Sequence, residues 1–332
     1  MIKWRINYMT MYIKRYLTLI CALSLALAFC PKAHAFWIWT PETGKWVNPK
    51  YDVKPTPQDQ LAYAHGFFEA GKYAEAKREY QKLLKAYPKA REAAEAQFYL
   101  GKVWEEFRKY FEAVEAYQKV IDRYPFSELG PKVIERQYII ANLLLEGKAK
   151  DSHYASALLG TDYNVVDIFR KVIKNDPYGS YAPASQYKIG LFLLQKKEYQ
   201  EARDEFEKTV NDYPDTKWAE SARYQIAVAD AKRSVKPQYD QNVTNIAVEG
   251  FKDFVKTSPD SELSKEAKAE IDRLRVKEAE NAYLVAQYYK KNKQLKAAKI
   301  YYQAVAEKYD DTIWGEKARK QIQLIDSGGV RK

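Results

Sequence analysis

The residues of this chain that could do acid–base or nucleophilic chemistry are few and scattered. His65 lies on an expected helix with no acidic residue close by in the sequence, and His153 lies beside Asp151 and Ser152. A catalytic histidine needs a nucleophile and an orienting group within hydrogen-bonding reach. Either histidine could be catalytic only through partners distant in the sequence, so we interpret both as surface or groove histidines.

Other patterns with chemical meaning are also missing from the sequence. Cys21 and Cys30 are the only cysteines, no Cys/His cluster has zinc spacing, and no glycine-rich phosphate loop occurs. Glu105 and Glu106 are adjacent, so a helix would point them to different faces. We therefore predict no catalytic residue, no cofactor, no metal site and no small-molecule substrate.

The sequence instead repeats one pattern of three residues six times. A small residue is followed four positions later by an aromatic and eight positions after that by a stop. The sets are Ala76/Tyr80/Pro88, Ala113/Tyr117/Pro125, Val165/Phe169/Pro177, Ala202/Phe206/Pro214, Ala247/Phe251/Pro259 and Ala298/Tyr302/Asp310. Internal repetition at such a period indicates stacked supersecondary units, which usually work as binding surfaces.

Each residue of the pattern has a physical role in a helix hairpin. The small residue opens the second helix and lets the first approach closely, the aromatic fills the space between them, and proline cannot continue a helix. Repeat one shows the whole unit: an apolar face from Leu61 to Phe68, a turn at Gly71-Lys72, and a second helix from Tyr73 to Tyr87. These are the marks of a tetratricopeptide (TPR) repeat. We predict an all-α solenoid of about five to six TPR hairpins with a C-terminal capping helix.

Composition agrees with a helical solenoid. The 332 residues are 46% hydrophobic and 30% charged, with only 13 glycines. The 28 tyrosines suit helix packing in which the ring is buried and the hydroxyl reaches water. The net charge of +11 includes five basic residues within positions 1–35, where no acid occurs, so the rest of the excess is mild. No basic stripe with interleaved aromatics is present, and we predict no nucleic-acid partner.

The stops are unevenly spaced, at 37, 52, 37, 45 and 51 residues. Because a plain repeat takes about 34 residues, three repeats carry extra length. We expect Gly147 to Tyr163 and Ser234 to Val243 to lengthen turns within hairpins. Glu262 to Asn292 contains no proline or glycine and predicts either one long helix or two abutting helices. Thr312 to Ile325 predicts the capping helix.

The first 35 residues have the features of an export signal. A short apolar run, Tyr16 to Phe29, follows two basic residues and is followed by the small-x-small sequence that ends at Ala35. We predict cleavage there and a mature chain that begins near Phe36. Two alternatives stay open: lipidation of Cys30, which Phe29 disfavours because a lipobox has a small residue before its cysteine, and an uncleaved anchor.

The segment 36–57 differs from the repeats because three tryptophans, Trp37, Trp39 and Trp46, lie among prolines and turn residues. We expect an extended lead-in. Its aromatics either pack onto the first repeat as a cap or form a docking element for a partner or the envelope surface. The predicted organisation is thus a signal peptide at 1–35, the lead-in at 36–57, repeats one and two at 58–130, repeats three to six with the cap at 131–326, and a disordered tail at 327–332.

Three segments make the resemblance more specific than that of a generic TPR protein: Tyr239 to Thr244, Val285 to Tyr289, and Tyr309 to Thr312. With the export signal and the repeats, they resemble the BamD family, also called YfiO or ComL, over roughly residues 58–326. The resemblance implies a non-enzymatic scaffold that binds the BamA barrel component and other Bam components. It also implies help in delivering unfolded outer-membrane proteins for insertion, from the periplasm at the inner face of the outer membrane. The poor lipobox and the tryptophan-rich lead-in depart from the family pattern, so the lead-in is a candidate means of attachment.

Two other functions stay open. A periplasmic adaptor of the Tol-Pal or cell-division type, resembling CpoB (YbgF), would use the same fold. An envelope enzyme with a TPR accessory region is the weakest, because no stretch outside the repeats is long enough for a catalytic domain.

The TPR pattern also predicts where partners bind, because the first helix of each hairpin lines the groove. The expected groove residues are Leu61, His65, Phe68, Phe98, Lys102, Tyr187 and Leu191. The alternative is that Leu61, Phe68 and Phe98 simply pack within the fold. The expected partner-docking turn holds Tyr239, Asp240, Gln241 and Thr244, since long loops in compact repeats are usually functional or disordered.

Overall fold

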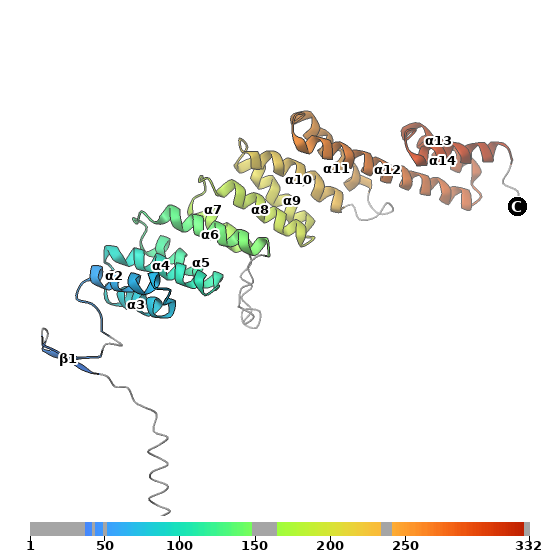
Figure 1. Ribbon diagram of the computed structural model, residues 1–332. Helices are drawn as coiled ribbons and strands as arrows, with labels where there is room; N and C mark the ends of the chain where they lie inside the picture. The colour runs from blue at the N-terminus through green and yellow to red at the C-terminus, as the bar shows by residue number, and fades with distance from the viewer. Residues whose placement is uncertain (1–36, 42–43, 49–51, 148–164, 234–240, 329–332) are drawn as a thin grey trace, which may run out of the picture.

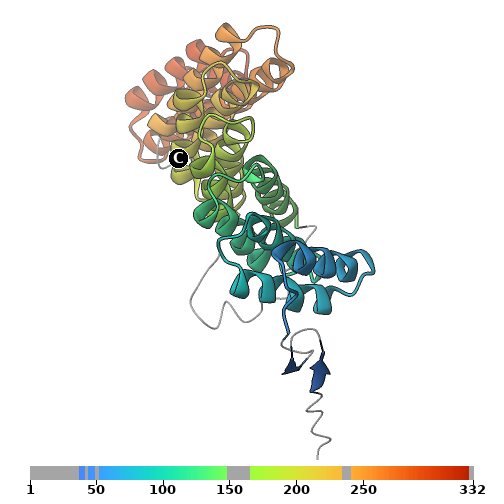
Figure 2. The ribbon, with the colours of Figure 1, turned by 90° about the vertical axis from the view of Figure 1, so that its left-hand side faces the viewer.

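The computed structural model describes residues 37–41, 44–48, 52–147, 165–233 and 241–328. Nearly all of the described chain is helical, and successive helices pack side by side along one elongated superhelix (Figures 1 and 2). The six hairpins are α2 (Pro57–Glu69) with α3 (Tyr73–Ala86), α4 (Arg91–Glu106) with α5 (Tyr110–Arg123), α6 (Gly130–Leu145) with α7 (Val165–Asn175), α8 (Ala182–Gln195) with α9 (Tyr199–Asp212), α10 (Lys217–Arg233) with α11 (Gln241–Thr257), and α12 (Glu262–Lys291) with α13 (Leu295–Lys308). The helix α14 (Ile313–Asp326) caps the last hairpin. The predicted all-α TPR solenoid is confirmed.

The repeated small residue and aromatic form the core of each hairpin. All six aromatics of the pattern are fully buried, and so are the five alanines. Val165 takes the small position in the third hairpin and is partly buried. Because the aromatic follows the small residue by one helical turn, the two lie on the same helix face. The pattern read from the sequence is therefore the pattern that closes each hairpin.

Four hairpin turns among the described residues have a left-handed backbone at the same position of the turn. Gly71 has φ 70°, Arg108 has φ 55°, Lys197 has φ 65° and Lys293 has φ 60°. In each case the residue two positions further on begins the second helix. Only glycine adopts this backbone region without a steric cost. Arg108, Lys197 and Lys293 therefore adopt a left-handed backbone conformation that is unfavourable for residues with a side chain.

The segment expected as one helix or two is a single helix. The first half of α12 packs Ala267 and Leu274 into a core with α10 and α11, and its second half packs Ala279 and Ala286 into a core with α13 and α14. Without proline or glycine, nothing in the backbone interrupts it. At about 1.5 Å per residue, 30 residues make a rod of about 45 Å.

One expected turn is shorter than predicted. We expected Ser234 to Val243 to lengthen the turn within the hairpin, yet Gln241 to Val243 belong to α11. That prediction was wrong for these residues, which continue the helical backbone of the segment after them. Residues 148–164 and 234–240 lie outside the described residues, so His153, Tyr239 and Asp240 do too. Cys30 and the predicted signal peptide likewise lie outside.

The lead-in contains structure that the sequence reading missed. Strands β1 (Ile38–Thr40) and β2 (Lys45–Val47) pair antiparallel in a small hairpin. The lead-in then joins the first repeat at Lys54 and Pro55, whose carbonyl oxygens accept hydrogen bonds from the Tyr87 hydroxyl at 2.7 and 3.1 Å. Thr56 caps α2, because its side chain accepts from the backbone N–H of Asp59. The described contacts of the lead-in with the helices thus come after the tryptophans.

Candidate partner-binding surfaces

A groove of about 1130 Å³ crosses the first two repeats. Its walls are the exposed side of α2, the segment 88–95 that enters α4, and the segment 122–129 between α5 and α6. We call it the N-terminal groove. It is formed because the prolines at positions 88 and 125 stop α3 and α5, so that the chain turns outward before the next helix begins.

The N-terminal groove combines an apolar floor with a charged rim. Leu61 and Ala62 lie on its α2 side, and Phe126 stands on the opposite side with a fully exposed ring (100%). The rim carries both signs, with basic residues at 89, 91 and 123 and acidic residues at 92, 122 and 128. An exposed apolar anchor within a mixed polar rim suits a peptide that offers an apolar side chain and its own polar backbone.

His65 lines this groove and is held by two partners. The Tyr80 hydroxyl lies 2.8 Å from Nδ1, and the Glu95 carboxylate lies 3.3 Å from Nε2. Because an ionised carboxylate only accepts, Nε2 carries a proton in this arrangement. Burial raises the pKa of Tyr80 well above its ordinary value, so that hydroxyl stays neutral. Glu95 reaches His65 from the neighbouring repeat.

The predicted groove residues fall into three places. Leu61 and His65 line the N-terminal groove. Phe68 is partly buried, packs edge-on against Tyr99, and lies 5.7 Å from the Lys102 ammonium. The other three pack within hairpins: Phe98 against Tyr117, Tyr187 against Phe206 and Trp218, and Leu191 beside that cluster. Phe98 is buried, as the packing alternative expects, and Tyr187, which that alternative did not include, is buried too. Their roles in partner binding stay predictions.

A second recurring contact was missed in the sequence. Gln60, Gln97 and Gln186 are buried on first helices, and each donates from Nε2 to a backbone carbonyl oxygen on the second helix 19 positions later, at 2.9 to 3.2 Å. In two hairpins the carbonyl belongs to a glutamate, Glu79 or Glu205, whose carboxylate accepts from the same amide. The glutamine lies 16 positions before the small residue of its repeat. That fixed offset was the available signal.

The middle repeats are joined by an ionic contact. Glu105 on α4 accepts hydrogen bonds from Arg136 on α6 and from the Tyr117 hydroxyl on α5. Burial, together with the Glu105 carboxylate, raises the pKa of Tyr117 far above its ordinary value. Further along, burial lowers the pKa of Lys188, whose ammonium contacts Asn142. These groups have partners within the fold, and Glu105 links neighbouring repeats.

The last hairpin exposes aromatic and aliphatic side chains. Tyr289 on α12 and Tyr301 on α13 stack with ring centroids 4.7 Å apart and planes 6° from parallel. Tyr288 lies beside Tyr289 at 5.8 Å and is 64% exposed, and Val285 is exposed one turn earlier. We call Val285, Tyr288, Tyr289 and Tyr301 the tyrosine patch. Ala286, within the same sequence segment, is buried in the hairpin core. One face of this helix segment therefore packs into the hairpin core, and another face exposes Val285 and Tyr288 to solvent.

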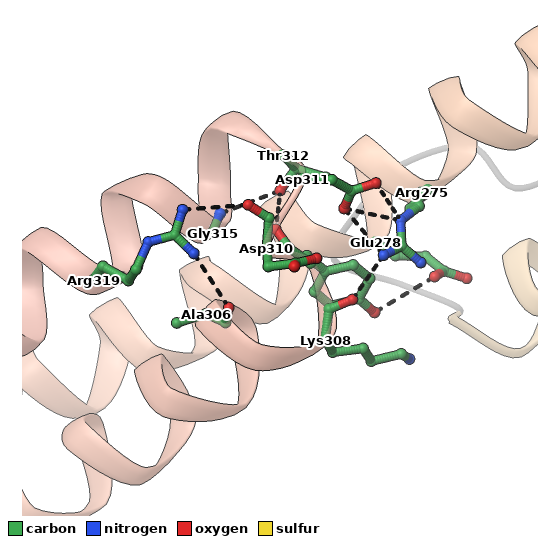
Figure 3. Close-up of polar contacts among 10 residues, drawn as sticks. Arg275, Glu278, Ala306, Lys308, Asp310, Asp311, Thr312, Gly315 and Arg319 are labelled. Carbon is green, nitrogen blue, oxygen red and sulfur yellow. Dashed lines mark hydrogen bonds and ion pairs between the residues drawn. The ribbon is translucent and has the colours of Figure 1, made fainter.

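A network of polar contacts fixes the turn after α13 (Figure 3). Arg275 on α12 donates to the Asp311 carboxylate at 3.0 Å and to the Lys308 carbonyl oxygen at 2.9 Å. The hydrogen bonds from Arg275 lower the pKa of Asp311. Thr312 caps α14 by accepting from the N–H of Gly315 at 3.2 Å. The turn thus holds α14 in place over the last hairpin.

Comparisons with known proteins place this architecture. A family model described as an outer membrane lipoprotein (YfiO) matches residues 227–324, and models of the tetratricopeptide repeat match residues 61–128 and 184–216. The outer membrane protein assembly factor BamD of Caulobacter vibrioides is 28% identical over 147 residues, which is 44% of this chain and 48% of that protein. The chain has the TPR fold, and its C-terminal part is similar to the YfiO/BamD family. It spans about half the length of the curated relative it matches.

Solved structures give a weaker likeness. The C-terminal part of a TPR repeat-containing protein from Cytophaga hutchinsonii is 17% identical to this chain, with a TM-score of 0.36. The alignment covers 75% of this chain and 82% of that protein's chain. A tetratricopeptide repeat protein from Parabacteroides merdae shares 14% identity, covers 81% and 98%, and has a TM-score of 0.33. These two matches concern the fold alone.

Two further properties of the described residues bear on the site. Within residues 37–41, 44–48, 52–147, 165–233 and 241–328, no three His, Cys, Asp or Glu side chains come together as metal ligands. Among the helices that the structure describes, none has the length and apolar character needed to span a bilayer.

Proposed function

We propose that this protein is a non-enzymatic scaffold for the assembly of outer-membrane β-barrel proteins. Its C-terminal repeats dock a BamA-like barrel component, and its N-terminal groove receives segments of unfolded outer-membrane proteins. The single observation that carries the proposal is the tyrosine patch, which lies inside the range that matches the YfiO family model. Export to the periplasm and association with the inner face of the outer membrane belong to the same proposal.

The tyrosine patch has the composition of a protein interface. Tyrosine is enriched in interface cores because a rigid ring buries a large area while its hydroxyl keeps a hydrogen bond. Stacking holds Tyr289 and Tyr301 in place before a partner arrives, so little side-chain entropy is lost on binding. Tyr288, beside this pair, is the exposed member and the expected anchor.

The N-terminal groove fits a different task. Its one fully exposed ring, Phe126, and its two-signed rim place few demands on the sequence of a bound segment. A chain that handles many unfolded proteins needs such tolerance. The groove and the tyrosine patch lie in the first and last repeats, so both can be occupied together (Figure 1).

The predicted docking turn remains part of the proposal in a changed form. Gln241 and Thr244 belong to the first turn of α11, and Thr244 is buried. Tyr239 and Asp240 come just before that helix in the sequence. We propose that the entry to α11 contributes to docking through these preceding residues, with Thr244 supporting the helix from within.

Site-specific photo-crosslinking in cells tests both surfaces. A crosslinker at Tyr288 is expected to capture a barrel protein with periplasmic domains, and one at Phe126 is expected to capture unfolded outer-membrane proteins. Tyr178, an exposed tyrosine elsewhere in the solenoid, is the matched control and should capture neither. Capture of Tol-Pal or cell-division components from Tyr288, with no barrel protein, would overturn the proposal in favour of an adaptor of the CpoB type.

A further inference from the structure

We propose that one face of the N-terminal hairpin inserts into the interface of a phospholipid bilayer. The face consists of Trp37, Trp39 and Trp46, and we call it the tryptophan face. It would attach the protein to the membrane surface whether or not the chain carries a lipid. This attachment is separate from the partner contacts proposed above and does not depend on them.

The strand register gathers the three indoles on one side. Trp39 pairs with Trp46 across the hairpin, and directly opposed residues of two strands point to the same face. Trp37 comes just before β1, two positions ahead of Trp39, so a continued strand alternation brings its ring to the same side. The Trp39 and Trp46 ring centroids are 5.8 Å apart with planes at 60°. Ile38 and Val47 pair on the opposite face.

The indoles of this face are unusually exposed for this protein. Trp37 is 57% exposed, Trp39 47% and Trp46 63%. The three tryptophans of the helical repeats are partly buried, each against another aromatic ring: Trp104 with Phe107, Trp218 with Tyr187, and Trp314 with Tyr283. Figures 1 and 2 show the hairpin standing clear of the first helices. Because an isolated two-stranded hairpin is marginal in water, this one gains most from a surface that covers its aromatic side.

The chemistry of the face favours a bilayer as that surface. Tryptophan is enriched at membrane–water interfaces, where its ring is buried at headgroup depth and its N–H still finds an acceptor. Between Trp37 and Asn48 the only charged residues are Glu42 and Lys45, which lie toward the connection of the two strands in the sequence. The face itself therefore offers three indoles and no charge. A broad uncharged face of this kind matches the planar interface of a bilayer, where indole rings lie at headgroup depth.

The position of the hairpin in the chain supports the same occupant. It follows directly after the predicted export segment, whose apolar run ends at Phe29. Any lipid on Cys30, or an uncleaved anchor, would hold residues close to the hairpin at the membrane. The mild positive excess of the chain after position 35 adds some attraction to anionic headgroups.

Vesicle binding of the exported protein tests the inference. The probe is a vesicle of phosphatidylethanolamine and phosphatidylglycerol with brominated acyl chains, which quench indole fluorescence on contact. The test variant is Trp37→Ser/Trp39→Ser/Trp46→Ser. The matched control is Tyr178→Ser, which removes an exposed ring from a loop of the solenoid. Circular dichroism melts show whether each variant keeps the helical fold.

We expect quenching in the unaltered protein and in the control, and its loss in the test variant. Vesicle partitioning of the test variant should fall by about a hundredfold in the absence of a lipid on the chain, since each indole buries a large apolar area. Quenching that is absent from the unaltered protein, or equal in the test variant, overturns the inference. A crosslink from Trp46 to a protein, without quenching, also overturns it and identifies a protein surface as the occupant.

Discussion

Gly101 on α4 lies against the ring of Tyr117 on α5 so closely that a side-chain carbon at Gly101 would come within 2.5 Å of the ring. Gly190 and Phe206 repeat the relationship two hairpins later, at 2.6 Å. Both glycines lie 12 positions before the small residue of their repeat. In these hairpins the helices approach as closely as glycine allows, and the ring of the second helix occupies the space of the missing side chain.

Replacing either glycine should therefore destabilise the protein. Gly101→Ala and Gly190→Ala are each expected to lower the free energy of unfolding by about 1–3 kcal/mol, because the ring must move within a closely packed core. Urea unfolding followed by circular dichroism measures the change. Gly66→Ala is the matched control: Gly66 lies in α2 with nothing near the added carbon, so alanine should stabilise by about 0.5–1 kcal/mol. Equal effects at all three positions would contradict the packing argument.

At a left-handed turn residue, substitution by glycine is expected to stabilise the protein. Lys197→Gly should raise the free energy of unfolding by up to about 1 kcal/mol, because glycine adopts φ near 65° without steric cost. Gly71→Ala, at the equivalent turn and with open space around it, should lower it by about 1 kcal/mol. Thermal melts of the two variants give the comparison. A destabilised Lys197→Gly would mean that the lysine side chain has a role in the turn beyond its backbone angle.

The contact between Arg136 and Glu105 predicts coupling between neighbouring repeats. Arg136→Ala should destabilise by about 1–2 kcal/mol, because it leaves a mostly buried Glu105 carboxylate with one partner fewer. Adding Glu105→Gln should recover part of that loss, since a neutral amide needs no counter-charge. Arg78→Ala, which removes an exposed pair with Glu75, is the control and should change stability by less than about 0.5 kcal/mol. Additive effects of Arg136→Ala and Glu105→Gln would show that the two side chains do not interact.

Buried tyrosines predict a loss of stability at alkaline pH. Burial raises the pKa of Tyr224 and of Tyr302 to about 12, whereas an unfolded tyrosine ionises near about 10. Below the unfolded pKa both states keep the proton, so stability does not depend on these groups. Above it, the unfolded state loses protons first, and stability falls as pH rises toward the folded pKa. Melting temperatures should therefore drop between about pH 10 and about pH 12.

Tyr302→Phe separates this effect from general alkaline damage. The variant keeps the ring in the last hairpin and removes the ionising hydroxyl, so its melting temperature should fall less steeply over the same pH range. Tyr178→Phe, at an exposed position, should leave the slope unchanged. Identical slopes for Tyr302→Phe and the unaltered protein would show that this hydroxyl does not titrate on unfolding.

The sequence predicts the hairpins well because their signals are local. A small residue and an aromatic four positions apart define a helix face, and a proline defines its end, so Ala76, Tyr80 and Pro88 need no knowledge of the rest of the chain. The capping helix after Thr312 follows from the same local rules, whereas these rules left one helix or two abutting helices open for the segment that forms α12. Contacts between side chains of different repeats could not be predicted. Glu95 contacts His65, and Arg136 contacts Glu105, but the sequence distance between the partners follows no repeating pattern.

The binding surfaces were harder to predict for a related reason. Phe98 and Tyr187 occupy groove positions of the TPR pattern, yet their rings turn into the hairpin and are buried. Phe126 lies in a connection between helices, where a periodic pattern assigns no role, and it is the fully exposed ring of the N-terminal groove. The small strands around Trp39 and Trp46 were missed because three residues are too few to show an alternation.

The single helix α12 has a mechanical consequence. The two cores that it joins share no flexible connection between residues 262 and 291, so the last hairpin and α14 cannot swing freely against α10 and α11. Bending there would have to break helical hydrogen bonds in the middle of a continuous rod. A force on the tyrosine patch is therefore transmitted along α12 to the core that this helix forms with α10 and α11. A partner bound at the patch would thus restrict the orientation of α10 and α11 as well.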